Sequence, residues 1–115
     1  MRISAGIAAI AAGFVTLGAQ AACENPTLLL SLPQGDSSTL DQMIEAQTAV
    51  KEYMGQMETY LACLNDDIET AGDDAAAEFK TLLVTRYNTA VVEMETVAAA
   101  FNEQLQAYRA ANPSE

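Results

Sequence analysis

The sequence has 115 residues, a length that fits a single domain. Sixteen aspartates and glutamates against five lysines and arginines give a net charge of −11. A protein this acidic repels nucleic acids and anionic lipid surfaces, so we expect neither as a partner. The chain has no histidine, which excludes Ser-His-Asp and Cys-His catalysis and imidazole metal sites.

Residues 1–21 have the three parts of a secretory signal peptide. Arg2 supplies a positive start, residues 3–17 carry no charge, and Ala19 and Ala21 place small residues where a signal peptidase cuts. The apolar run is shorter than the roughly 20 residues that a membrane-spanning helix needs. We therefore predict cleavage after Ala21, a periplasmic or secreted protein, and no membrane insertion of the mature chain. Four remaining cations and sixteen carboxylates would give that chain a charge of −12.

Cys23 and Cys63 are the two cysteines of the chain. An even number of cysteines in an exported protein predicts a disulfide between them. The alternative is lipid attachment at Cys23, which falls at the end of the leader. Such a site normally has an aliphatic residue three positions earlier, where this chain has Gln20, and lipidation would leave Cys63 unpaired. We therefore predict the disulfide.

Residues 22–38 are expected to form an extended arm. Pro26 and Pro33 flank a short apolar run, residues 28–32, and each proline disfavours helix and pushes the preceding residue toward extended geometry. An extended chain covers about 3.3 Å per residue, so the arm is long enough to run back along the next helix to Cys63. The disulfide would then hold the apolar run against that helix.

Residues 39–68 contain apolar side chains spaced alternately three and four apart, which predicts a helix with one apolar seam. Ser38 is the expected N-cap. Gly55 costs about 1 kcal/mol relative to alanine in a helix, which we interpret as a sign that another backbone passes close by. Tyr53 and Tyr60 are expected to flank the seam and to receive the arm. The predicted seam consists of Leu40, Met43, Gln47, Val50, Met54, Met57, Leu61, Leu64 and Ile68, and Gln47 is its one polar member.

An acidic turn follows, in which Gly72 should end the first helix and Asp73 should cap the second. Aligning Gly72 with the central glycine of an EF-hand loop places Asp67, Glu69 and Glu78 at ligand positions. Two other ligand positions are then alanines, which have no side-chain oxygen. We therefore predict no metal site and regard these three acids as weak candidates only.

A second helix is predicted from about residue 74 to Ala111, because apolar side chains recur every three or four residues from Phe79 to Tyr108 and Pro113 follows. Two long helices joined by a short turn form an antiparallel hairpin. We therefore predict an all-α fold in which residues 39–112 form a coiled-coil-like helical hairpin domain. A bare hairpin buries little surface, so a second copy of the chain could complete a four-helix bundle.

Five short segments resemble an uncharacterised family of small secreted bacterial helical proteins. The pattern is C-x-x-P, L-P-x-G, M-x-x-A-Q-x-x-V-K-x-Y and Y-L-x-C-L, and the matching segments are 23–26, 32–35, 43–47, 50–53 and 60–64. This resemblance implies export and a helical structure. It implies no activity and therefore transfers no catalytic residue.

The sequence contains no recognisable catalytic residue and no cofactor motif. The chain has no glycine-rich phosphate loop, and Glu93 and Glu95 lie on different faces of the predicted helix. We expect a non-enzymatic envelope protein of the interaction or structural kind, with a protein partner that the sequence does not name. The alternative is a periplasmic carrier that sequesters an apolar ligand or a cation.

Overall fold

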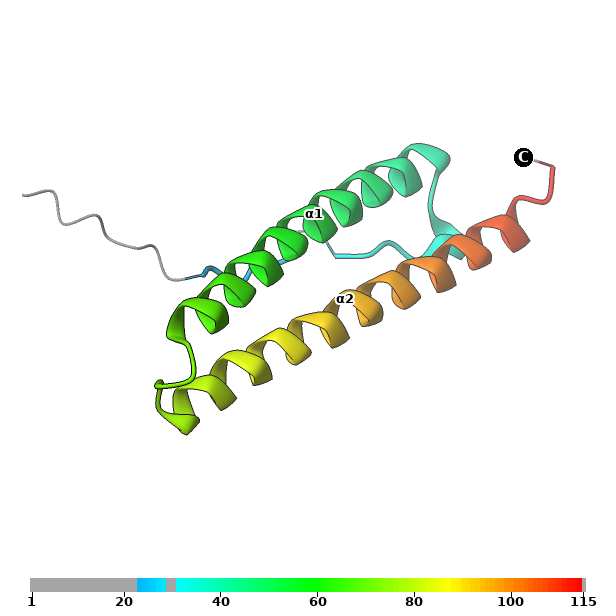
Figure 1. Cartoon of the computed structure of the whole chain (residues 1–115). Helices are drawn as coiled ribbons and strands as arrows, with labels where there is room; N and C mark the ends of the chain where they lie inside the picture. Colours follow the sequence, from blue (N-terminus) through cyan, green and yellow to red (C-terminus); the bar gives the residue numbers. More distant parts are fainter. Residues whose placement is uncertain (1–22, 29–30, 115) are drawn as a thin grey trace, which may run out of the picture.

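The computed structural model describes residues 23–28 and 31–114, which form two long antiparallel helices and an arm (Figure 1). Helix α1 spans Leu40–Ala71, helix α2 spans Ala77–Ala111, and a short 3-10 helix, η1, spans Gly35–Ser37. Residues 23–28 and 31–114 contain no strand. The predicted all-α hairpin with an extended N-terminal arm is therefore confirmed. The predicted signal peptide lies outside the described residues.

A capping box starts α1 one residue later than predicted. The Gln42 N–H donates to Thr39 Oγ1 at 3.2 Å, and the Thr39 N–H donates to Gln42 Oε1 at 2.8 Å. These reciprocal bonds satisfy two amide groups that a helix start leaves unpaired. Ser38 is therefore not the N-cap, and its hydroxyl donates instead to the Gln34 carbonyl at 2.6 Å. At the other end Gly72, with φ of 66°, terminates α1 as predicted.

The second helix begins at Ala77, a few residues later than the sequence predicts. Ala76 is its N-cap and supplies no side-chain hydrogen bond, so the prediction that Asp73 caps this helix is wrong. The residues after Gly72 are needed to reverse the chain, and the Ala75 N–H donates to the Gly72 carbonyl at 3.5 Å. Helix α2 ends at Ala111 as predicted, and the backbone N–H of Asn112 donates to the Tyr108 carbonyl. Neither helix in the described part of the chain is long and apolar enough to cross a membrane.

Two apolar clusters between α1 and α2 hold the hairpin together. The cluster nearer the turn contains Tyr53, Met57, Tyr60, Leu64, Leu83 and Ala90. The cluster nearer the open end contains Met43, Ala46, Val50, Phe101 and Tyr108. Each cluster joins the two helices, and the small alanines at 46 and 90 are almost completely buried. Apolar side chains that recur with the 3.6-residue period of a helix thus explain why α1 and α2 pack against each other.

The buried seam of α1 differs from the predicted one on one side. Positions 43, 50, 57 and 64 are buried as predicted. Leu40 and Gln47 are exposed, and the alternating members of the buried seam are Ala46, Tyr53 and Tyr60. These residues stand one position before the predicted 47, 54 and 61. The predicted members Met54, Leu61 and Ile68 are partly buried and still pack against the clusters. Helix α1 is therefore rotated only slightly, so that its buried face is centred on the tyrosine rings, whose burial removes much apolar surface from water.

The arm packs against the apolar clusters that α1 and α2 share. Leu28 packs against the cluster nearer the turn and Leu32 against the cluster nearer the open end. At the end of the arm, η1 lies on the last turns of α2, and the Gly35 N–H donates to Gln104 Oε1 at 2.9 Å. Gly35 is buried, and a β-carbon there would overlap the backbone of Gln104.

Gly55, which we expected to face another backbone, does not. A β-carbon at this position would meet no atom within 4 Å, and the residue is exposed on α1. The close backbone approach that requires a glycine occurs instead at Gly35. The glycine inside the helix therefore has no packing role.

Candidate functional site

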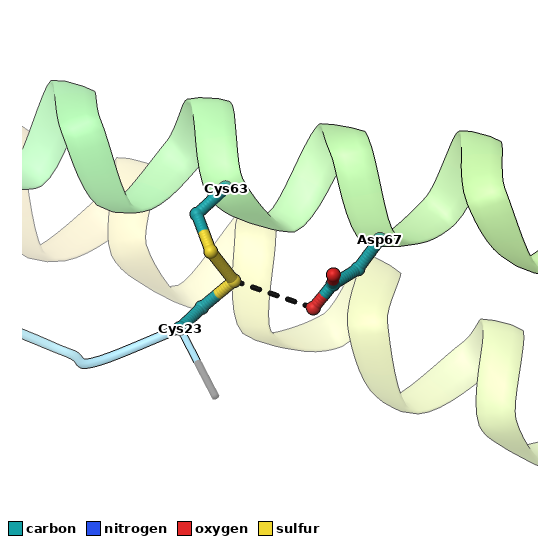
Figure 2. The surroundings of a disulfide bond; sticks show 3 residues. All are labelled: Cys23, Cys63 and Asp67. Atoms are coloured by element: carbon teal, nitrogen blue, oxygen red, sulfur yellow. Dashed lines mark hydrogen bonds between the residues drawn. A yellow bond between two sulfur atoms is a disulfide. The ribbon is translucent and has the colours of Figure 1, made fainter. Parts of the chain in front are cut away.

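The predicted disulfide is present and fastens the arm to α1. Cys23 opens the described part of the arm, Cys63 lies two turns before the end of α1, and their Cα atoms are 5.7 Å apart (Figure 2). The bond closes a loop of 40 residues. By the chain-entropy estimate such a loop adds about 3–4 kcal/mol to the free energy of unfolding. We call this connection the clasp.

Asp67 lies directly beside the clasp. It follows Cys63 by one helical turn, so both side chains project from the same face of α1, and Asp67 Oδ2 is 3.3 Å from Cys23 Sγ (Figure 2). A disulfide sulfur has no hydrogen to donate, so in the oxidised protein this is a close contact between a carboxylate oxygen and a sulfur. After reduction the Cys23 thiol can donate a hydrogen bond to the same oxygen.

The three weak metal candidates from the sequence do not form one site. Asp67, Glu69 and Glu78 are all exposed. In the described part of the chain, the one group of three potential ligand residues close enough to share an ion is Cys23, Cys63 and Asp67. The calcium-loop arrangement is therefore not formed, and Asp67 is brought to the cysteines instead.

A cleft of about 620 Å³ opens beside the clasp. The beginning of the arm forms one wall and α1 forms the other. Its lining combines apolar and polar groups and consists of Cys23, Glu24, Asn25, Pro26, Gln56, Thr59, Tyr60 and Cys63.

A smaller groove of about 160 Å³ lies between the helices at the open end of the hairpin. We call it the helix-end groove, and its lining consists of Leu40, Met43, Ile44, Gln47, Phe101, Leu105, Tyr108 and Arg109. Leu40 and Ile44 are 50% and 51% exposed, although both are large aliphatic side chains. Arg109 is the one charged residue of the lining. The groove is thus an apolar surface with a cation at its edge.

The two tyrosines expected to receive the arm are buried in the cluster against which Leu28 packs. Burial raises the pKa of Tyr53 above its usual value, and the nearby Glu93 carboxylate raises it further. The phenol therefore stays neutral at physiological pH. Tyr53 therefore contributes packing to the core rather than an acid or a base.

Comparison with known proteins adds no further information on the site. No family model matches the chain, and the searches of curated proteins and of solved structures gave no match.

Sequence reasoning missed the proximity of Asp67 to the clasp and the groove at the open end. The proximity of Asp67 to the clasp could have been predicted, because Cys63 and Asp67 are four residues apart and such residues lie on the same face of a helix. No comparable signal exists for the groove, since its lining comes from the start of α1 and the end of α2, which are far apart in the sequence.

Proposed function

We propose that the chain is an exported, non-enzymatic protein that binds another protein through the helix-end groove. The observation that carries the proposal is the exposure of Leu40 and Ile44 beside a groove that both helices line. An apolar groove between two helices suits an amphipathic helix, whose apolar stripe removes such side chains from water.

Export is supported by the leader-like composition of residues 1–21 and by the disulfide. Disulfides form and persist in oxidising compartments and are rare in the cytosol. The resemblance of residues 23–64 to small secreted bacterial proteins is consistent with this proposal. We place the mature protein in the periplasm or outside the cell.

A non-enzymatic role is supported by the chemistry of the helix-end groove and by the absence of histidine. The chain has no histidine, and the helix-end groove contains neither a cysteine nor a carboxylate. General acid–base catalysis requires a group that titrates near the working pH and lies within hydrogen-bond reach of the substrate. The lining of the groove supplies apolar contacts rather than such a group.

The proposed occupant is a helix of a different protein rather than a second copy of this chain. Each copy carries a net charge of −11, or −12 after loss of the leader, so two copies repel each other. A partner with a net positive charge would be attracted to this acidic chain as a whole. A homodimer, which the sequence also suggests, is an alternative outcome of the experiment below.

The experiment places a photo-crosslinking residue at Ile44 in the exporting cell. The control carries the same residue at Glu45, the next position of α1, which is exposed and does not line the groove. We expect one specific adduct from position 44, none from position 45, and loss of the adduct when Leu40→Asp is added. An adduct between two copies of the chain, or equal labelling from both positions, contradicts the proposed partner.

The cleft beside the clasp favours a second candidate function, a carrier of an apolar ligand or a cation. Its volume of about 620 Å³ lies within the range of roughly 300–1,000 Å³ that is typical of ligand pockets. Native mass spectrometry of the exported protein tests this candidate. A retained ligand that disappears on Tyr60→Ala would support it, whereas a spectrum of the bare chain would contradict it.

A further inference from the structure

We propose that the clasp is a metal site of the reduced protein, in which the Cys23 and Cys63 thiolates and the Asp67 carboxylate bind Zn²⁺. The oxidised protein, whose sulfurs are bonded to each other, does not offer this site. The proposal does not depend on the protein-binding function proposed above.

The geometry of the three donors supports the site. Cys63 and Asp67 stand one turn apart on the same face of α1, and the arm brings Cys23 to them (Figure 2). One donor atom from each residue lies within 4.8 Å of the other two. Zinc binds sulfur at about 2.3 Å and carboxylate oxygen at about 2.0–2.2 Å, so its ligand atoms lie roughly 3–4 Å from one another. Opening the disulfide therefore requires the two sulfurs to separate by only about 2 Å.

The chemical nature of the three donor atoms determines which metal ion should bind. Two thiolates favour zinc-like cations over magnesium and calcium, which prefer oxygen ligands. Three protein ligands leave the fourth tetrahedral position to water. The local sequence also favours a cation, because residues 52–79 contain no lysine or arginine and Glu24 directly follows Cys23.

Reduction of the disulfide and binding of the metal are two separate steps, and the atoms and electrons of each step balance. A phosphine attacks one sulfur, breaks the S–S bond and is oxidised to the phosphine oxide; water supplies the oxide's oxygen and the protons for both thiols. Zn²⁺ then replaces the two thiol protons, which pass to the buffer. The Zn²⁺ ion thereby replaces the disulfide as the link that holds the arm to α1.

The site also predicts a change in exposed apolar surface. Reduction alone should free the arm and uncover the surfaces of Leu28 and Leu32 that pack on the helices. Binding of Zn²⁺ to all three ligands should bring the arm back. Fluorescence of a dye that binds apolar surface should therefore rise on reduction and fall again when Zn²⁺ is added.

The experiment titrates Zn²⁺ into the purified protein by calorimetry, before and after reduction with a phosphine. A dithiol reductant is avoided because it chelates zinc. Titration with Co²⁺ in parallel reports thiolate ligation through its charge-transfer absorption. We expect one ion per reduced chain and no binding to the oxidised chain.

Asp67→Asn and Asp66→Asn form the matched pair of variants. Each removes one carboxylate from adjacent positions, but only Asp67 belongs to the group of donors. Asp67→Asn should weaken binding at least roughly tenfold, since loss of even an outer-shell partner typically costs that much, and Asp66→Asn should leave it nearly unchanged. Helical circular dichroism of both oxidised variants confirms that they fold. Absence of binding after reduction, one ion per two chains, or equal affinity in the two variants would overturn the proposal.

Discussion

At the scale of single residues, two glycines with opposite surroundings give the sharpest prediction. Gly55 lies in the interior of α1 with open space around it, whereas Gly35 lies against the backbone of Gln104. Gly55→Ala should raise the free energy of unfolding by about 1 kcal/mol, because alanine is the better helix former. Gly35→Ala should lower it by at least about 1 kcal/mol, because η1 must move away from α2 and the bond from the Gly35 N–H to Gln104 is lost.

Urea unfolding of the two variants, monitored by circular dichroism, measures both effects. The same substitution is made in each case, so a general effect of replacing glycine cannot produce opposite signs. Equal stabilisation by both variants would show that η1 does not rest on α2 in solution.

The disulfide between Cys23 and Cys63 was predictable from the sequence, whereas the contact between Gly35 and Gln104 was not. The cysteine count and the leader limit the pairing to a single choice. Gly35 and Gln104 are 69 positions apart, and no local pattern links them. The sequence P-Q-G-D indicates a turn, but a turn glycine does not reveal which backbone passes beside it.

At the scale of the helix, the rotation of α1 can be tested at two adjacent positions. Ala46 is fully buried, whereas Gln47 is exposed. Ala46→Leu should lower the free energy of unfolding by about 1–3 kcal/mol, because three additional carbon atoms must fit into a packed interface. Gln47→Leu should change it by no more than about 0.5 kcal/mol, as is usual for surface substitutions.

Thermal unfolding of both variants under identical conditions provides the comparison. A larger effect at position 47 than at position 46 would restore the seam that the sequence first suggested and would contradict the observed rotation.

The spacing pattern of α1 fixes the presence of an apolar seam but not its centre. Methionine, valine and leucine at 43, 50, 57 and 64 belong to either of two seams that differ by one residue. The tyrosines decide between them, because the arm and α2 together cover their rings. That choice depends on a segment that comes earlier in the chain, so the periodicity of the helix alone does not contain it.

At the scale of the whole molecule, the clasp adds to the stability of the fold, but the helices do not need it in order to pair. The buried members of both clusters come from α1 and α2, so the helices should remain paired when the bond is broken. Cys63→Ser should lower the free energy of unfolding by about 3–4 kcal/mol and Tm by on the order of 15 °C. Helical circular dichroism at 25 °C should be nearly unchanged, and dye binding to apolar surface should increase.

The variant Cys23→Ser is the natural control, because it removes the same bond and leaves α1 intact. The two variants should lose stability to a similar degree. Collapse of the helical signal in both would show that the arm, and not the two apolar clusters, holds the hairpin together.

The central claim, an exported hairpin with its arm fastened by a disulfide, is tested most directly by the intact mass of the protein purified from exporting cells without reductant. We predict a chain of residues 22–115 that gains the mass of two hydrogen atoms on reduction and whose peptide map links Cys23 to Cys63. A chain that retains its first 21 residues, carries a lipid on Cys23, or has two thiols free before reduction would contradict it.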